Sequence, residues 1–458
     1  MADVALLCDF GSTYTKLTAV DLSDEAIVAA TRVPTTVTTH LADGLRAGEV
    51  ELKRQGIHEF SHRLACSSAA GGLKMAVSGL MPELTVEAAT RAALGAGAKI
   101  WRVYSHEMTE DDVVALNDSP PDIFLLTGGT DGGNKENILA NAALLARHLT
   151  VEFPIVIAGN RVAAKEAASR LQRFHPVVCG NVMPRLGVLE VEQVQEAIRG
   201  VFLKHIVNAK GLHDVASELV APLIPTPSAV LSAIRLLARG DTTTAGMGDI
   251  MAADIGGATT DLYSIGEGLP TEAAATLRGL PEPYAKRTVE GDIGMRYSCR
   301  GVVEAVGEAV FCAALGLDSA GLEMALSRRE RDVEWLPETT ADKDFDQTLA
   351  AHALRLALMR HAGQLETVYT PVGKSYVQTG KDLRPIQHVI FTGGPLVASH
   401  DPQALLQTSL QTPANHLLPL QATALVDRRY TLSALGLLAT WQPEKALRMI
   451  QKELQPHE

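Results

Sequence analysis

The sequence predicts an α/β protein whose two halves repeat the same architecture. Short apolar runs typical of buried strands alternate with amphipathic helices along the 458 residues, as in mixed sheets covered by helices. An Asp-x-Gly turn joins two apolar runs at Asp9, and a second one does so at Asp254. In each half a strand ending in Thr-Gly-Gly follows. Each motif alone is common turn chemistry, but four motifs in matched order indicate a duplication.

The first repeated element is a β-hairpin. Residues 4–8 and 17–20 are apolar and flank the first glycine turn, and residues 250–253 and 262–265 flank the second. Two apolar runs joined by a short turn with glycine at its tip predict antiparallel strands.

The second repeated element is a buried strand that ends in a glycine turn. Residues 123–126 lead into Thr127-Gly128-Gly129, and residues 389–391 lead into Thr392-Gly393-Gly394. We expect the two strands to be equivalent.

The repeats divide the chain into two predicted domains. The first covers residues 1–245, with a subdomain inserted at about 60–120, and the second covers residues 246–458, with an insertion at about 310–380.

Helix signals complete the assignment. A helix is predicted after an Asn134 cap, and another over about 228–237, after Thr226 as cap and proline at the next position. The acidic stretch 330–346 predicts an exposed loop, and residues 432–454 predict a helical tail interrupted at Pro443.

Composition excludes several classes of function. Lys plus Arg is 41 and Asp plus Glu is 53, so a net charge of −12 argues against nucleic acid as the main partner. The five cysteines are scattered without a C-x-x-C pair, which argues against a disulfide framework and fits a reducing cytoplasm. No run reaches 18 apolar residues, and no basic-then-apolar leader is visible, so neither a membrane span nor a signal peptide is expected.

The two hairpin tips carry the chemistry of a phosphate site. Glycine exposes backbone N–H groups, which bind anions in concave clusters, and nearby hydroxyls and Lys16 add donors and a positive charge. Two such hairpins would grip a polyphosphate from both sides. Asp9 and Asp254 would then lie beside the phosphates, an arrangement that calls for Mg²⁺ held through its waters.

These motifs resemble those of the actin, Hsp70 and sugar-kinase superfamily. Residues 9–16 resemble its first phosphate motif, 254–261 the second, 391–395 the adenosine motif and 433–439 the second connecting helix. The resemblance implies two duplicated actin-like (RNase H-like) ATPase lobes with mixed sheets and a nucleotide cleft between them. It also implies that the C-terminal helix packs back on the first lobe.

Four further segments resemble the GlmL/MutL accessory-protein family: residues 66–73, 126–134, 208–212 and 287–297. That family is associated with glutamate mutase and other adenosylcobalamin-dependent aminomutases, and it is unrelated to the mismatch-repair protein of the same name. The resemblance implies an actin-like ATPase that acts on such a mutase. Reactivating factors of B12-dependent diol dehydratases share the superfamily and suggest a chaperone-like mechanism by analogy.

The superfamily's nucleotide-contacting roles carry over to matching positions. Asp9 would orient Mg²⁺ waters, and Asp254 would orient Mg²⁺ or the attacking water. The positions implied for phosphate contacts are Gly11, Ser12, Thr13 and Lys16 on one side and Gly256, Gly257 and Thr259 on the other. Gly393 and Gly394 would face adenosine.

Three other residues are weaker candidates. Asp131 lies where the superfamily places a hydrolytic residue, but it would serve equally as a helix cap. Asp292 and Arg296 would flank the nucleotide or act as structural caps.

Two other motifs suggest different chemistry. Residues 58–62 match the H-E-x-x-H zinc pattern, but Gly56 and the small residues that follow favour a helix end or strand entry. Residues 128–135 and 373–375 each lack an essential part of a P-loop and are interpreted as turns.

Together these features predict a cytoplasmic, Mg²⁺-dependent ATPase that acts as an accessory or reactivating protein for an adenosylcobalamin-dependent mutase. ATP would hold the lobes closed, and hydrolysis would let them open. The alternatives are a small-molecule kinase on the same fold and a nucleotide-gated scaffold without turnover. No cobalamin-binding string occurs, so cobalamin binding by this chain itself is not expected.

Overall fold

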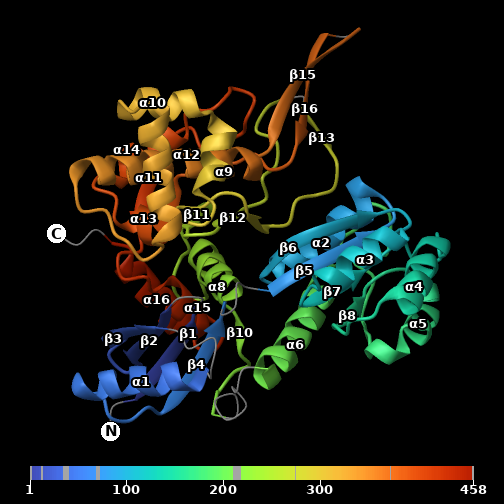
Figure 1. Ribbon diagram of the computed structural model, residues 1–458, viewed down its shortest axis with the longest axis horizontal. Coiled ribbons are helices and arrows are strands. Elements are labelled where there is room, and N and C mark those ends of the chain that lie inside the picture. The colour runs from blue at the N-terminus through green and yellow to red at the C-terminus, as the bar shows by residue number, and fades with distance from the viewer. Residues whose placement is uncertain are drawn as a thin grey trace. The chain divides into compact units, whose positions relative to one another are not determined.

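A computed structural model describes residues 3–11, 14–34, 41–68, 73–209, 218–273, 275–371 and 373–455 (Figure 1). The chain packs as two compact units. Unit 1 extends to Ala233 and also contains Ser433–Met449, and unit 2 contains Ile234–Leu432 and the residues from Ile450 onward.

The first sheet of unit 1 has the strand order β10-β4-β1-β2-β3. These strands are β1 (Val4–Phe10), β2 (Tyr14–Asp21), β3 (Ala26–Pro34), β4 (His62–Ser67) and β10 (Ile224–Pro225). β2 runs antiparallel to both β1 and β3, whereas β4 runs parallel to β1 and to β10. All seven residues of β1 are buried, and this central strand is a continuous apolar run apart from its penultimate residue, Asp9.

The main sheet of unit 2 has the order β14-β12-β11-β17-β18. These strands are β11 (Ile250–Ile255), β12 (Thr260–Ile265), β14 (Ala285–Glu290), β17 (His388–Thr392) and β18 (Thr423–Val426). Every pairing has the same direction as its counterpart in unit 1. The predicted duplication and the mixed α/β class are therefore confirmed, and both sheets have the RNase H-like topology.

The predicted equivalence of the two Thr-Gly-Gly strands is wrong. By strand order β17 corresponds to β4, whereas β7 (Ile123–Leu126) belongs to a separate parallel sheet of unit 1, ordered β6-β5-β7-β8-β9. Both strands are short, apolar and parallel, and both end at a glycine turn. That combination suits many parallel strands, so it does not identify a position in the sheet.

The separate sheet of unit 1 comprises β5 (Leu73–Gly79), β6 (Ala98–Ser105), β7, β8 (Ile155–Ile157) and β9 (Val177–Val178). It therefore spans more of the chain than the subdomain expected at about 60–120. Its helices are α2 (Glu87–Gly95), α3 (Glu110–Asp118), α4 (Glu136–His148), α5 (Arg161–Arg170) and α6 (Glu192–Ala209), with single turns η1 (Pro82–Val86) and η2 (Gln172–Phe174). Helices α4 and α5 lie side by side and cover one face (Figure 1). The Asn134 side chain accepts the N–H of Asn137 at 3.1 Å, as a cap should.

The remaining helices of unit 1 are α1 (Leu41–Arg54) and the parts of α8 (Thr226–Arg239), α15 (Leu432–Ala439) and α16 (Pro443–Glu453) that fall within it. The predicted helix after Thr226 and the tail interrupted at Pro443 are confirmed. α8 and α15 are in backbone contact, because a Cβ at Gly436 would lie 1.9 Å from the Ala229 carbonyl oxygen.

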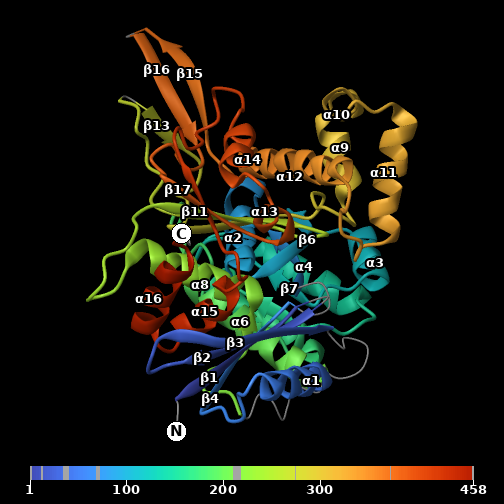
Figure 2. The same ribbon diagram turned by 90° about the vertical axis from the view of Figure 1, so that its left-hand side faces the viewer.

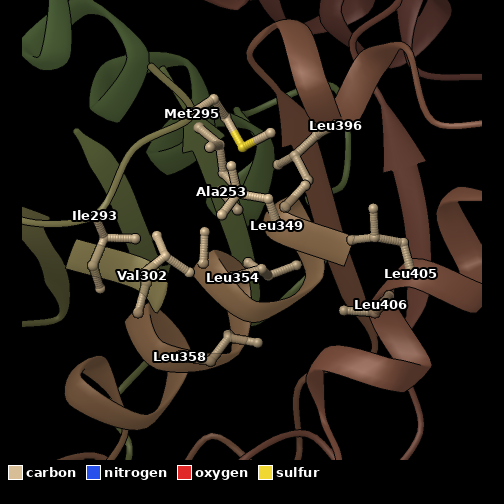
Figure 3. Close-up of a cluster of buried hydrophobic side chains, with 14 of the residues drawn as sticks. Ala253, Ile293, Met295, Val302, Leu349, Leu354, Leu358, Leu396, Leu405 and Leu406 are labelled. Atoms are coloured by element: carbon tan, nitrogen blue, oxygen red, sulfur yellow. The ribbon is translucent and has the colours of Figure 1, made fainter. Parts of the chain in front are cut away.

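The core of unit 2 forms around its longest helix, α12 (Thr340–His361). Figure 3 shows Leu349, Leu354 and Leu358 of this helix packed with Ala253 of β11 and with Val302. The other helices are α9 (Cys299–Val306), α10 (Glu308–Leu315), α11 (Ser319–Arg331), α13 (Gly394–Val397) and α14 (Pro402–Ser409). Among the described residues no single helix is long and apolar enough to cross a membrane; α10 and α11 reach that length only jointly, across a 97° bend.

The loop predicted at 330–346 is confirmed only for residues 332–339, and the prediction is wrong for the two ends, which belong to helices. Only the residues between Arg331 and Thr340 separate α11 from α12. Thr339 caps α12 by accepting the N–H of Asp342, and Asp346 pairs with two arginines. Of the acidic residues that suggested solvent, Asp342 thus lies at a helix start and Asp346 in ion pairs with buried arginines.

A three-stranded sheet of β13 (Ala275–Arg278), β15 (Gln364–Thr370) and β16 (Gly373–Thr379) extends away from α12 and α14 (Figure 2). Residues 373–375 begin β16, directly after the turn of the β15–β16 hairpin. A P-loop needs a helix at this point, so these residues do not form one, and they begin a strand where a turn was predicted.

Candidate functional site

The two repeated hairpins close in the same way. In unit 1 the N–H of Gly11 donates to the Tyr14 carbonyl at 3.0 Å, and in unit 2 the N–H of Gly256 donates to the Thr259 carbonyl at 2.9 Å. Ser12 and Thr13, predicted to contact phosphate, lie outside the described residues. Each hairpin has an aspartate one residue before the end of its first strand.

Asp9 of the first hairpin is held by hydrogen bonds from several neighbouring side chains. Its side chain is buried, and three neutral donors surround the carboxylate. The Thr226 hydroxyl donates to Oδ1 at 2.7 Å, the Cys66 thiol lies 3.4 Å from the same oxygen, and the Ser433 hydroxyl donates to Oδ2 at 2.9 Å. Burial, with the Asp9 charge as a further cause, raises the pKa of Cys66 well above its usual range, so this thiol stays a neutral donor.

Local folding explains why these donors meet. Cys66 is the register partner of Asp9 on parallel strand β4. Thr226 begins α8 and Ser433 lies in the first turn of α15, so two helix N-termini reach the carboxylate. Helix N-termini favour negative charge, and the two hydroxyls fix its orientation.

Lys16 lies opposite Asp9 across the first hairpin. Directly opposed residues of an antiparallel pair project from the same face of the sheet. The structure therefore places the predicted lysine and the predicted aspartate on one face, at the tip of unit 1.

Asp254 occupies the equivalent position in unit 2. Its register partners are Asp261 on β12 and Thr392 on β17. Gly393 follows with φ of +85°, and a Cβ there would lie 2.5 Å from the Asp254 carboxylate oxygen Oδ1. Glycine is thus required at 393 because the backbone lies directly against the aspartate. The space beside Gly394 is open, since a Cβ there would meet nothing within 4 Å.

The glycines of the second hairpin loop are not required by the fold. Neither Gly256 nor Gly257 has positive φ, and the nearest atoms to an added Cβ would be 3.4 and 3.6 Å away, which are ordinary contacts. The loop therefore leaves room at its surface that a larger residue would fill. Thr259, a third predicted phosphate contact, turns its hydroxyl toward Asp261 at 3.4 Å.

Two buried charged residues near the second hairpin were not predicted. Asp261 occupies the position in the second hairpin that Lys16 occupies in the first. Arg287 donates to this aspartate at 2.6 Å and neutralises its charge. Asp427 accepts the Thr392 hydroxyl at 3.2 Å and the N–H groups of Thr431 and Leu432. It thus joins the end of β17 to the start of α15. Arg287 and Asp427 are both separated in sequence from the motifs that they contact.

Asp131 lies in the loop after β7, in the separate sheet of unit 1. Its Oδ1 accepts the N–H of Arg161 at 3.0 Å and the Asn181 side chain at 2.9 Å. It therefore caps α5 rather than α4, and among the described residues no hydrogen bond joins it to Asp9. Its hydrolytic role stays a prediction.

The other two weaker candidates make structural contacts. Asp292 receives both terminal nitrogens of Arg360, at 2.8 and 2.9 Å. Arg296 donates to Asp346 at 3.2 Å. Both side chains thus make ion pairs within unit 2, and the N-cap of α9 is Ser298 and neither of them. Their predicted place beside the nucleotide stays a prediction.

The histidines of the H-E-x-x-H pattern do not lie on a helix. α1 ends at Arg54, His58 precedes β4, and His62 begins that strand, so the two histidines do not share a helix face. Within the described ranges, no three His, Cys, Asp or Glu residues are grouped to hold a metal directly. Asp9 and Asp254 remain suited to Mg²⁺ through water, which needs only one or two carboxylates.

A cavity of about 310 Å³ lies between α9, α10 and α11. Its lining includes Arg300, Glu304, Glu308 and Glu323, and it includes none of the predicted nucleotide-contacting residues. Arg300 is already held by Glu323 and Glu330 at 2.7–2.9 Å.

Two sequence comparisons with known proteins identify the same family. The sequence profile of the family described as MutL protein matches residues 5–454. Protein MutL of Clostridium tetanomorphum is 46% identical over 460 residues, which cover 99% of this chain and 99% of that protein. Among solved structures, nucleotide-free acetone carboxylase is 17% identical with a TM-score of 0.42, over 96% of this chain and 70% of that one. The activator of the 2-hydroxyisocaproyl-CoA dehydratase from Clostridium difficile, with bound ADPNP, is 9% identical with a TM-score of 0.32, over 99% of both chains.

Proposed function

Because the chain belongs to the MutL protein family, we propose that it is a Mg²⁺-dependent ATP-binding and ATP-hydrolysing accessory protein of an adenosylcobalamin-dependent mutase. The mutase part of the proposal comes from the family resemblance. The nucleotide part is supported by one observation, the duplicated hairpins that each carry an aspartate beside a glycine turn.

The geometry within each unit supports the proposed roles, which come from the superfamily resemblance. The Asp9 carboxylate, fixed by the hydroxyls of Thr226 and Ser433, would accept hydrogen bonds from Mg²⁺-bound waters. Asp254, held against the Gly393 backbone, would do the same or orient the attacking water. When bound, Mg²⁺ would neutralise phosphate charge and polarise the phosphoryl oxygens.

The hairpin loops would contribute backbone donors to the phosphates. Gly256 and Gly257 leave their surroundings open, so phosphate oxygens can approach the main chain. The open space beside Gly394 would accept adenosine, as the superfamily resemblance implies. ATP binding and hydrolysis would then alter the state in which the protein engages its mutase.

The test is Mg²⁺-dependent ATP binding by calorimetry and steady-state ATP hydrolysis, with and without the mutase from the same source. Asp9→Asn and Asp254→Asn should each weaken Mg-ATP binding at least about tenfold, the usual cost of losing a charged hydrogen-bond partner. Asp344→Asn, an exposed aspartate of α12, is the matched control and should bind like the wild type.

The outcomes separate three functions. Hydrolysis that the mutase stimulates and Asp254→Asn abolishes would support the proposal. ATP binding without turnover in either condition would contradict the ATPase and leave the scaffold. Phosphorylation of a small acceptor would favour the kinase instead.

A further inference from the structure

The loop of the second hairpin is held by the short segment that precedes α9. Three carbonyls of the loop each accept one hydrogen bond from this segment: Met295 N to Gly256 O at 3.0 Å, Arg296 N to Gly257 O at 2.8 Å, and Ser298 Oγ to Ala258 O at 2.9 Å. The carbonyls of residues 256–258 therefore all face the segment.

This bonding fixes the direction of the loop amides. In a trans peptide the C=O of one residue and the N–H of the next point in opposite directions. Carbonyls of residues 256–258 that face the segment therefore turn the N–H groups of residues 257–259 away from it. Within the described chain, no hydrogen bond occupies the N–H of Gly257 or Ala258. Such a row of unoccupied N–H donors is an anion-binding arrangement.

Gly294 allows the segment to approach this closely. A Cβ at 294 would lie 2.7 Å from the Gly257 carbonyl oxygen and 2.7 Å from the Ala258 carbonyl carbon. Contacts that short do not occur in folded proteins, so glycine is required here, in contrast to Gly256 and Gly257.

The Arg296 side chain anchors the segment to the helices of unit 2. Its guanidinium donates to the Trp335 carbonyl at 3.1 Å and to the Asp346 carboxylate at 3.2 Å. Asp346 also accepts from Arg329, whose side chain is almost completely buried, at 2.6 Å. The guanidinium of Arg296 therefore points toward α11 and α12, while its backbone and the first carbons of its side chain lie against the hairpin loop.

We propose that residues 294–298 are positioning residues of the phosphate site, which hold the second hairpin with its N–H groups facing the β- and γ-phosphates of ATP. This inference rests on the proposed function. Through Arg296 and Asp346, the helices α11 and α12 set the orientation of a loop that they do not form.

Ser298→Ala tests the proposal because it removes the hydroxyl that donates to the Ala258 carbonyl at 2.9 Å, and also to the Gly291 carbonyl at 3.2 Å, and adds no new group. Affinity for Mg-ATP should fall about threefold to tenfold, which corresponds to one lost hydrogen bond. Affinity for AMP, which lacks the β- and γ-phosphates, should not change. Ser409→Ala is the matched control, since Ser409 also donates to backbone carbonyls within unit 2. It should change neither affinity.

Hydrogen exchange of the amides of Gly256, Met295 and Arg296, which donate to backbone carbonyls at this contact, gives a second readout when measured without nucleotide. Exchange should be faster in Ser298→Ala and unchanged in Ser409→Ala. An unchanged ATP affinity in Ser298→Ala, or equal losses for ATP and AMP, would overturn the proposal. If wild-type protein binds no ATP, the proposed function and the phosphate role fail together. Exchange then tests the loop contact alone: faster exchange supports it, and equal rates refute it.

Discussion

The contact between α8 and α15 leads to a prediction about both stability and nucleotide binding. Gly436 of α15 lies against Ala229 of α8, and a Cβ would be 1.9 Å from the Ala229 carbonyl oxygen. A backbone carbonyl cannot rotate away as a side chain can. In Gly436→Ala the two helices must therefore separate by about 1 Å or more.

The size of the effect follows from two opposing contributions. Alanine is favoured over glycine within a helix by about 0.8–1 kcal/mol. Overpacking in a tightly packed interior costs about 1–3 kcal/mol, and a rigid backbone obstacle belongs at the upper end. The net expectation is a loss of about 2 kcal/mol, or a fall of about 4–8 °C in Tm for a unit of this size.

The same change should weaken nucleotide binding. Ala229 lies three residues after Thr226, and Gly436 lies three residues after Ser433. The contact is thus one helical turn from the two hydroxyls that hold Asp9. Separating the helices would lengthen at least one of these hydrogen bonds, so Mg-ATP affinity should fall together with Tm.

The control is Gly200→Ala in α6, where a Cβ would meet nothing within 4 Å. This variant should be as stable as the wild type or up to about 1 kcal/mol more stable. Urea unfolding and differential scanning calorimetry would measure both variants. If Gly436→Ala matches Gly200→Ala in stability, the helix contact is not as close as described.

Three further predictions concern buried groups. Burial lowers the pKa of Lys381 to about 7, so between pH 7 and 10 the native state binds fewer protons than the unfolded chain. The stability of the wild type relative to Lys381→Met should therefore rise by about 1.4 kcal/mol per pH unit over this range. Urea unfolding at pH 6.5, 8 and 9.5 measures this, and a constant difference would contradict it. Burial likewise raises the thiol pKa of Cys66 well above its usual range and that of Cys8 to about 12. Mass spectrometry should therefore find neither thiol alkylated by iodoacetamide at pH 8 in the native protein, and rapid labelling would show that they are accessible. Asp261→Ala should cost about 3 kcal/mol, because the Arg287 charge stays buried without its carboxylate, and adding Arg287→Met should recover most of that loss; a double variant as unstable as the single one would refute this account.

The sequence predicted local structure well where one short segment contains the whole signal. Both hairpins were predicted because apolar runs and a glycine turn lie within about twenty residues of each other. The strand order was harder, because a Thr-Gly-Gly turn can end any parallel strand. The ends of the acidic stretch at 330–346 were misinterpreted, because a sequence does not distinguish a carboxylate that pairs with buried arginines from a solvated one.

The surroundings of the candidate site were hardest to predict. Asp9 was identified from its motif, but the hydroxyls that hold it come from Thr226 and Ser433, which lie 217 and 424 residues away. No pattern in a single sequence links residues that far apart. The role of Gly294 was equally hidden, since its requirement arises from a loop about forty residues earlier.

The hydrogen bond between Ser433 and Asp9 has a consequence for synthesis of the protein. A ribosome adds about 5–20 residues per second, so Ser433 is made roughly 20–80 s after Asp9. During that interval the nascent chain already contains the first hairpin but lacks one of the donors that fix its carboxylate. The aspartate is therefore fully oriented only after Ser433 has been made, and a truncated product ending before α15 would lack that donor altogether.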